Sequence, residues 1–245
     1  MPGHTHFAES TEEYLEAIYR LEREGPGVTT SGLAADLGVA PASVSGMLKK
    51  LAADGYLTYT ARSHAALTDD GLEIATRVLR RNRLAEVFLH DVLGMPWDEV
   101  HAEACKLEHA ISDRVEERLI AVLGDPSVCP HGHPIPSHDR PAPPRCGLRL
   151  AEALPGSTVR VVEVVEDEPE MLRLLAAAGL RPGATATVVE HPAPGAPVIV
   201  ESEAGRTAIR FARNAIDASF ASAERKAALR RQFASRNSAP AGRSA

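Results

Sequence analysis

The chain has few cysteines and no long hydrophobic run. Only Cys105, Cys129 and Cys146 occur among its 245 residues, too few and too scattered for a disulfide framework, so a reducing cytoplasm is the expected location. No run of about 18 apolar residues could span a membrane, and the N-terminus lacks the charged and apolar regions of a signal peptide. The net charge of −6 argues against general coating of nucleic acid but allows a local basic patch on a DNA-binding domain.

Catalytic motifs are absent as well. No Ser/His/Asp triad can be assembled from a recognisable motif, and no glycine-rich phosphate-binding loop occurs. Function therefore has to be inferred from other side-chain groupings.

The segment from His101 to His109 concentrates side chains that bind metals. In an α-helix, which turns about 100° per residue, His101, Cys105, Glu108 and His109 project from one face. Imidazole, thiol and carboxylate together suit a divalent transition metal. The alternative is an ordinary core helix with one buried cysteine and a few solvated polar residues.

The organisation is mainly α with small β parts. We divide the chain into residues 1–70, residues 71–136 with two longer helices, a proline-rich linker at 137–154, a small β domain at 155–222 and a flexible tail at 223–245. In the β domain we expect strands at 158–165, 184–190 and 198–201 around a helix at 168–178.

Residues 1–70 have the layout of a winged helix-turn-helix. Helices are expected at Thr11–Glu24, at a short segment ending at Gly38, and at Pro41–Asp54, followed by a two-stranded wing with Arg62 at its tip. Small residues on the third helix permit close approach to bases, and lysines reach phosphates. The alternative is a winged helix that binds protein. The candidate DNA-binding residues are Pro41, Ala42, Ser43, Gly46, Lys49, Lys50 and Arg62.

Several of these segments together resemble one family. Ser10-Thr-Glu-Glu-Tyr-Leu-Glu-Ala-Ile-Tyr19, Arg83-Leu-Ala-Glu86, Val100–Asp113 and His131-Gly-His-Pro-Ile-Pro136 look like the diphtheria toxin repressor family. The resemblance covers about nine tenths of the chain. It implies a metal-activated, dimeric transcriptional repressor with a winged helix-turn-helix, a helical dimerisation domain and a C-terminal SH3-like small β-barrel domain of the FeoA type.

The resemblance also implies a primary metal site. Its ligands would be Glu13 on the first helix together with Cys105, Glu108 and His109. Glu16 matches a further carboxylate of manganese-selective members. The alternative for both glutamates is a solvated first turn favoured by the helix dipole.

An ancillary site is implied at Asn82, Glu86 and His101, with Asp167 and Glu170 as third-domain candidates. Asn82 departs from the family, which has a histidine there, and an amide oxygen is a weaker ligand. The carboxylates of Asp167 and Glu170 would equally complement a helix dipole.

The metal is expected to be Mn(II), because the first helix offers hard oxygen ligands, with Fe(II) as the alternative because of Cys105. Up to two divalent ions per subunit are expected. A zinc site within Cys129-Pro-His-Gly-His133 and Cys146 is disfavoured because the spacing is too tight.

The expected partners are palindromic double-stranded operator DNA and a second copy of the chain, with no membrane. Apolar positions of residues 71–123 are expected to form the dimer interface, namely Leu84, Val87, Phe88, Val92, Val115 and Leu119. The competing functional class is a metal-dependent enzyme in which the winged helix is incidental.

Overall fold

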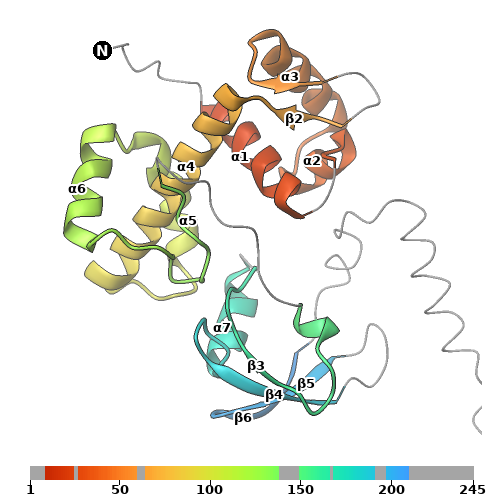
Figure 1. Ribbon diagram of the computed structural model, residues 1–245, viewed down its shortest axis with the longest axis vertical. Helices are drawn as coiled ribbons and strands as arrows, with labels where there is room; N and C mark the ends of the chain where they lie inside the picture. The colour runs from red at the N-terminus through yellow and green to blue at the C-terminus, as the bar shows by residue number, and fades with distance from the viewer. Residues whose placement is uncertain are drawn as a thin grey trace, which may run out of the picture.

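Three domains follow one another along the chain in the computed structural model (Figure 1). The structure describes residues 9–24, 27–59, 64–137, 149–165, 168–190 and 197–209. Arg62, Asp167 and the tail at 223–245 lie outside these residues. Within the described part of the chain, no helix has the length and apolar character needed to cross a bilayer.

The first domain is the expected winged helix-turn-helix. Its helices are α1 (Glu9–Glu24), α2 (Thr30–Asp36) and α3 (Pro41–Ala53). The hydroxyl of Thr29 caps α2 by accepting a 3.0 Å hydrogen bond from the Gly32 amide. Strands β1 (Leu57–Thr58) and β2 (Ala66–Leu67) form the base of the wing, pairing antiparallel.

One long helix, α4 (Asp69–Val87), belongs to two hydrophobic cores. Its N-terminal half packs with α1, α2 and α3 through Ile74 and Val78, whereas Ala85 packs with the next domain around Val100 and Ala104. Figure 1 shows α4 passing from the winged helix into the helical domain. The helix therefore connects the DNA-binding domain directly to the second domain.

The second domain contains more segments than the two long helices that we expected. After α4 come a π-helical turn (Phe88–Val92), α5 (Val100–Leu107), a 3₁₀ turn (Glu108–Ala110) and α6 (Asp113–Leu123). The α-helix ends at Leu107 because Ile111 is extended and the Ser112 side chain caps α6. The prediction of one continuous helical face from His101 to His109 was therefore wrong at its C-terminal end.

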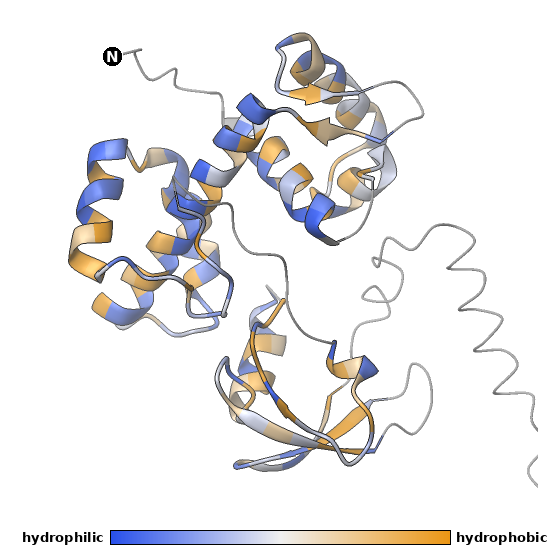
Figure 2. Cartoon of the chain, viewed as in Figure 1, coloured by the Kyte–Doolittle hydropathy of each residue, from blue (hydrophilic) through white to orange (hydrophobic). Residues whose placement is uncertain are grey.

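The third domain contains a four-stranded antiparallel sheet and one helix. The strands β3 (Thr158–Arg160), β4 (Thr185–Glu190), β5 (Val198–Ser202) and β6 (Gly205–Ile209) pair in sequence order, and α7 spans Pro169–Ala177. A 3₁₀ turn at Leu150–Glu152 precedes them. We did not predict β6. The strongly hydrophobic strand β5 contributes Val198 and Val200 to the core of this domain (Figure 2).

The third domain docks on the loop that follows α6. Trp97 of the second domain packs with Val164 and Leu172 of the third. The Val164 amide donates a 2.9 Å hydrogen bond to the His131 carbonyl. Gly132 has a φ of 85°, and a Cβ at this position would clash with the Val162 carbonyl. This close approach fixes the segment around Cys129 and His131 between two domains.

Buried ion pairs join α4 to α6. The carboxylate of Glu116, which is 3% exposed, accepts hydrogen bonds from Arg80 and from Arg81, the latter at 2.8 Å. Arg81 also pairs with Asp113. Because these charges are shielded from water, removing one partner leaves the others uncompensated.

We predict that Glu116→Ala lowers the free energy of unfolding by about 3–5 kcal/mol, because it removes the buried carboxylate that accepts hydrogen bonds from both Arg80 and Arg81. Chemical denaturation of the metal-free protein measures this loss. Glu117→Ala is the matched control, since Glu117 is exposed on the same helix, and its effect should stay within about 0.5 kcal/mol. Equal effects of the two substitutions would contradict the role given to the Glu116 network.

Candidate metal centre

The first helix of the DNA-binding domain contacts the 3₁₀ turn of the second domain through charged side chains. Glu12 Oε2 lies 2.7 Å from His109 Nδ1. The other ring nitrogen, His109 Nε2, lies 3.2 Å from Glu108 Oε1. One imidazole thus joins a carboxylate from each domain.

The glutamate that reaches His109 is not the one that the family resemblance implied. Glu13 is exposed, whereas Glu12 is only 7% exposed. Glu12 and Glu16 are four residues apart and share a helix face. Glu16 is half-buried; burial raises its pKa, and the nearby charges of His101 and His109 oppose that rise. In the structure Glu12, rather than Glu13, contacts His109, so Glu12 is a further candidate ligand from α1.

Glu108 carries the clearest sign of a missing positive partner. The side chain is buried, and its Oε2 has no hydrogen-bond partner among the described residues. Burial and the neighbouring Glu16 carboxylate raise the pKa of Glu108 to about 8. A cation at this position would satisfy the orphaned oxygen and relieve the repulsion between carboxylates, so these residues fit a divalent metal.

Cys105 lies on the same side of the cluster but is exposed. Its Sγ is 3.6 Å from the Asn82 amide nitrogen and 3.5 Å from His101 Nε2. Asn82 also donates a hydrogen bond to Glu108. Asn82, which we assigned to the ancillary site, therefore contacts two residues of the primary one.

A second group of side chains surrounds Glu86, which is 2% exposed. Glu86 Oε1 is 2.9 Å from His101 Nδ1 and 3.6 Å from His131 Nδ1. Ligand atoms of Glu86, Cys129 and His131 all lie within 4.8 Å of one another. Sequence reasoning weighed Cys129 and His131 only against their near neighbours, and no sequence signal linked them to Glu86. Glu170, the remaining ancillary candidate, is exposed.

Contacts explain the electrostatics of this second group. Burial alone would raise the pKa of Glu86, but hydrogen bonds from His101 and His131 hold it well below its usual range. Burial and the adjacent Glu86 carboxylate raise the pKa of the Cys129 thiol. The nearby Arg83 guanidinium, which donates to the Pro134 carbonyl, supplies positive charge.

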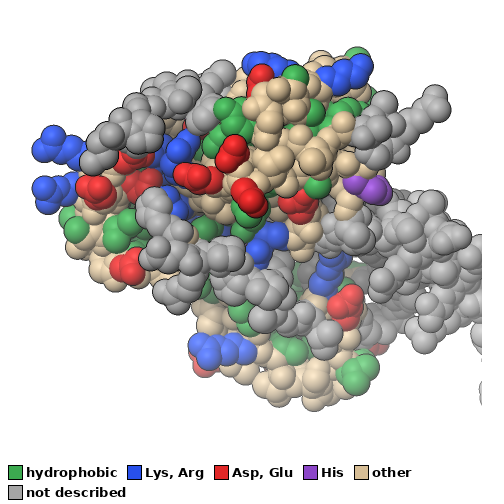
Figure 3. Space-filling view, turned by 45° about the horizontal axis from the view of Figure 1, so that its top comes forward, with side chains coloured by type: hydrophobic (Ala, Val, Ile, Leu, Met, Phe, Trp, Pro, Cys, Tyr) green, Lys and Arg blue, Asp and Glu red, His purple; other side chains and the backbone are tan. Residues whose placement is uncertain are grey.

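The predicted DNA-binding face of α3 is exposed in the part of the chain that the structure describes. Val44 and Leu48 are buried on its inner side, and lysine and arginine side chains are visible at the top of Figure 3, with acidic side chains gathered nearer the middle. A Cβ on Gly46 would meet nothing within 4 Å. The exposed candidates are Pro41, Ala42, Ser43, Gly46, Lys49 and Lys50.

Comparisons with known proteins assign each domain. Residues 6–65 match the iron dependent repressor N-terminal DNA binding domain. Residues 68–137 match the iron dependent repressor metal binding and dimerisation domain. Residues 148–212 match the FeoA domain. The three matches follow the order of the domains in the structure.

Whole-chain relatives agree with these domain matches. The iron-dependent repressor IdeR of Mycobacterium leprae is 39% identical over 204 residues, covering 78% of this chain and 89% of that repressor. The diphtheria toxin repressor of Corynebacterium diphtheriae is 36% identical over 168 residues, covering 68% and 71%.

Solved structures are similar over most of their length. A manganese-dependent transcriptional repressor in complex with manganese has a TM-score of 0.75 and 33% identity, covering 84% of this chain and 95% of that one. ScaR with bound Zn²⁺ has a TM-score of 0.70 and 32% identity, covering 82% and 93%. These relatives are repressors rather than enzymes. Their identity and coverage show that the chain belongs to the diphtheria toxin repressor family of metal-dependent transcriptional repressors.

Proposed function

We propose that this protein is a Mn(II)-activated repressor that binds a palindromic operator as a homodimer. The observation that carries the proposal is the contact of Glu12 with His109, because it joins the DNA-binding domain to the second domain at a cluster of metal-ligand side chains. The proposed ligands are Glu12, Glu16, Cys105, Glu108 and His109.

Charge repulsion provides the switch. The Glu16 carboxylate disfavours ionisation of Glu108, and their repulsion loosens α1 against the 3₁₀ turn once both are charged. A bound divalent cation supplies the positive charge that these carboxylates lack. With α1 held, the two recognition helices of a dimer keep a fixed separation that matches successive major grooves about 34 Å apart. Metal and DNA then raise each other's affinity by the same factor.

The balance of donor atoms favours Mn(II). Glu12, Glu16 and Glu108 offer hard carboxylate oxygens, and His109 an imidazole, against the single thiol of Cys105. Carboxylates suit Mn(II), whereas thiols favour softer ions. Both iron-dependent and manganese-dependent repressors are among the relatives. Fe(II) is therefore the second candidate, and anaerobic operator binding at controlled free Mn(II) or Fe(II) distinguishes the two.

A second copy of the chain is the proposed partner of the exposed apolar surface on the second domain. Leu84 and Val87 are buried within their own chain, so they are unavailable for the interface suggested by the sequence. Val92 and Val115 remain 52% and 47% exposed, and Val122 near the end of α6 is 70% exposed. Large exposed apolar side chains on this metal binding and dimerisation domain are consistent with an interface between two copies of the chain.

Our first prediction for this site concerns helix register. Glu12→Gln and Glu108→Gln should each abolish metal-stimulated operator binding, because they remove a charge from the buried cluster. Glu13→Gln is the matched control, with the same chemical change on an exposed neighbour, and should retain stimulation within about twofold. Fluorescence anisotropy with labelled operator at fixed free Mn(II) gives the comparison. If Glu13→Gln loses metal-stimulated operator binding while Glu12→Gln retains it, Glu13 is the ligand and Glu12 is not.

The second prediction concerns pH. Burial raises the pKa of Glu108 to about 8, well above the 4.5 of an exposed glutamate. Between these values the folded metal-free protein holds a proton that the unfolded chain releases, so its free energy of unfolding should fall as pH rises from about 5 to 8. Thermal melting across this range measures the trend. Glu108→Gln should flatten it, and an equally steep fall in that variant would remove Glu108 as the cause.

The third prediction concerns DNA contact. Lys49 is exposed on α3, so Lys49→Ala should weaken binding to all sequences and lower the salt slope by about 0.9, the value for one phosphate contact. The control is Lys106→Ala on α5, where the lysine pairs with Glu103 at 2.6 Å. If Lys49→Ala changes neither the DNA affinity nor the salt slope, α3 does not lie in the major groove.

A further inference from the structure

The helix α1 makes a second long-range polar contact, at the end opposite the candidate metal centre. Glu22 lies in the last turn of α1, and its Oε1 accepts a 3.1 Å hydrogen bond from the Leu67 backbone amide, 45 positions further along the chain. Leu67 is the last residue of β2, the strand that returns from the wing. The contact therefore joins the end of α1 directly to the base of the wing.

The Glu22 carboxylate is matched to this amide rather than to solvent. Glu22 is half-buried, and burial raises its pKa, whereas the hydrogen bond from Leu67 lowers it. Among the described residues, the Leu67 amide is its only hydrogen-bond partner. In a two-stranded sheet both strands are edges, so the outward backbone donors of β2 need a partner from elsewhere. A carboxylate is a stronger acceptor for such a donor than a neutral oxygen.

Two neighbouring contacts hold the same returning segment against the turn that follows α1. The Ala65 amide donates a 3.0 Å hydrogen bond to the Val28 carbonyl. The His64 ring lies over Gly27, where an added Cβ would come within 2.3 Å of it. Together with the Glu22 contact, the returning segment meets α1 and its C-terminal turn at three successive points.

Polar contacts thus hold α1 near both of its ends. Near the N-terminus, Glu12 Oε2 lies 2.7 Å from His109 Nδ1 of the second domain. Glu22 follows about 15 Å further along the helix axis, at 1.5 Å per residue. Between them, the buried side chains of Leu15 and Ile18 keep the helix in the core of the first domain. A displacement of α1 at the domain junction is therefore passed to β2.

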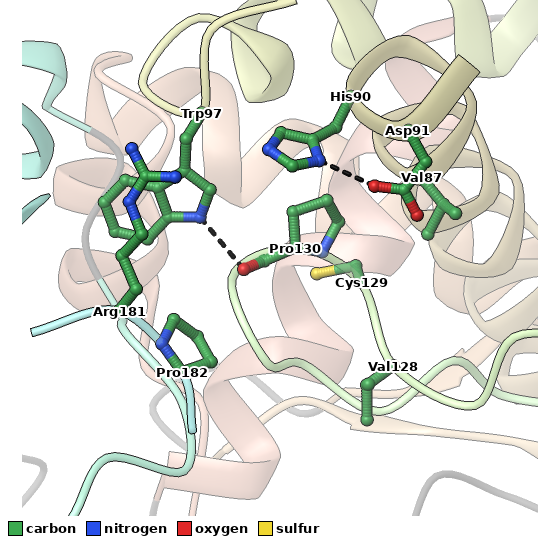
Figure 4. Close-up of a pocket in the computed structure, with 9 residues that line it drawn as sticks. All are labelled: Val87, His90, Asp91, Trp97, Val128, Cys129, Pro130, Arg181 and Pro182. Atoms are coloured by element: carbon green, nitrogen blue, oxygen red, sulfur yellow. Dashed lines mark hydrogen bonds and ion pairs between the residues drawn. The ribbon is translucent and has the colours of Figure 1, made fainter. Parts of the chain in front are cut away.

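The second domain, on which the N-terminal contact acts, is itself held by the third. Arg181 of the third domain lies over the Trp97 ring, 5.2 Å from its centroid. Figure 4 shows this pair together with the 2.9 Å hydrogen bond that the Trp97 indole donates to the Pro130 carbonyl. The first domain is therefore the part that moves when α1 shifts against His109.

We propose that Glu22 is a positioning residue for DNA binding, which holds the base of the wing at a fixed place relative to α1 and so links the wing to the metal centre. The proposal rests on the operator binding proposed above. A wing base that is already held has less freedom to lose when DNA binds, so the affinity is higher. Without the Glu22 carboxylate, the Leu67 amide loses its acceptor and β2 shifts against α1.

The test compares two substitutions of Glu22 with a charge-matched control. Glu22→Leu removes the acceptor but keeps a side chain that favours a helix, whereas Glu22→Gln keeps an oxygen that accepts from Leu67. Glu73→Leu makes the same change of charge at an exposed position of α4. The probe is a labelled DNA duplex that the wild-type full chain selects from a random library at fixed free Mn(II).

We expect Glu22→Leu to bind this duplex about tenfold more weakly than the wild type, the scale of one hydrogen bond to a charged group. Glu22→Gln should restore most of the affinity, and Glu73→Leu should bind no more weakly than the wild type. A loss of negative charge alone would strengthen DNA binding, so the expected weakening has the opposite sign.

Measurements without DNA separate positioning from loss of the fold. Amide hydrogen exchange of β2 should be faster in Glu22→Leu but not in Glu22→Gln, with β5 of the third domain unchanged in both. Mn(II) affinity should equal that of the wild type, because Glu22 is not a proposed ligand. If circular dichroism shows that Glu22→Leu is unfolded, Glu22→Ala makes the same comparison.

The outcomes distinguish this proposal from the function on which it rests. Unchanged DNA affinity in Glu22→Leu, while Lys49→Ala weakens binding, would overturn the role of Glu22 and leave the proposed function standing. Equal weakening by Glu22→Leu and Glu22→Gln would also overturn it, because the hydrogen bond to Leu67 would then not be the cause. If the wild type selects no duplex at any Mn(II) concentration, the proposed function fails and the role of Glu22 with it.

Discussion

The structure depends on one polar contact between segments far apart in the sequence, the pairing of Glu12 with His109 across 97 positions. Both side chains have lost most of their contact with water, and both sit at the boundary of two domains. Charged groups in such a place are stable only when their charges balance. The angle between the domains is therefore tied to the charge state of a few side chains, which makes this junction suited to control by a cation.

The sequence was sufficient to predict the helices of the first domain but not which side chains of α1 meet the second domain. Apolar spacing located α1 and α3, and Gly38 with Pro41 marked the turn between α2 and α3. It could not distinguish Glu12 from Glu13, because adjacent residues differ by only about 100° and the side that meets the second domain is decided by tertiary packing. The same holds for the end of α5, where a continuous helical pattern hides the change at Leu107 to a 3₁₀ turn.

The cluster of Glu86, Cys129 and His131 could not be predicted from the sequence for a different reason. Glu86 and Cys129 are 43 positions apart, and the loop that brings Cys129 back to α4 is held by contacts with the third domain, including the close approach at Gly132. No local pattern encodes such a meeting. The sequence marked Cys129 and His131 as possible metal ligands by residue type alone. Their proximity to Glu86 depends on the packing of the domains around the loop after α6.

The length of α4 has a geometric consequence for operator choice. At about 1.5 Å per residue, its 19 residues make a rod about 28 Å long. The buried pairs with Glu116 anchor this rod to the second domain, while its other end is embedded in the winged helix. A tilt of about 7° at the anchored end displaces the far end by about 3.4 Å, the rise of one base step. Small rearrangements at the domain junction thus displace the winged helix by about the rise of one base pair.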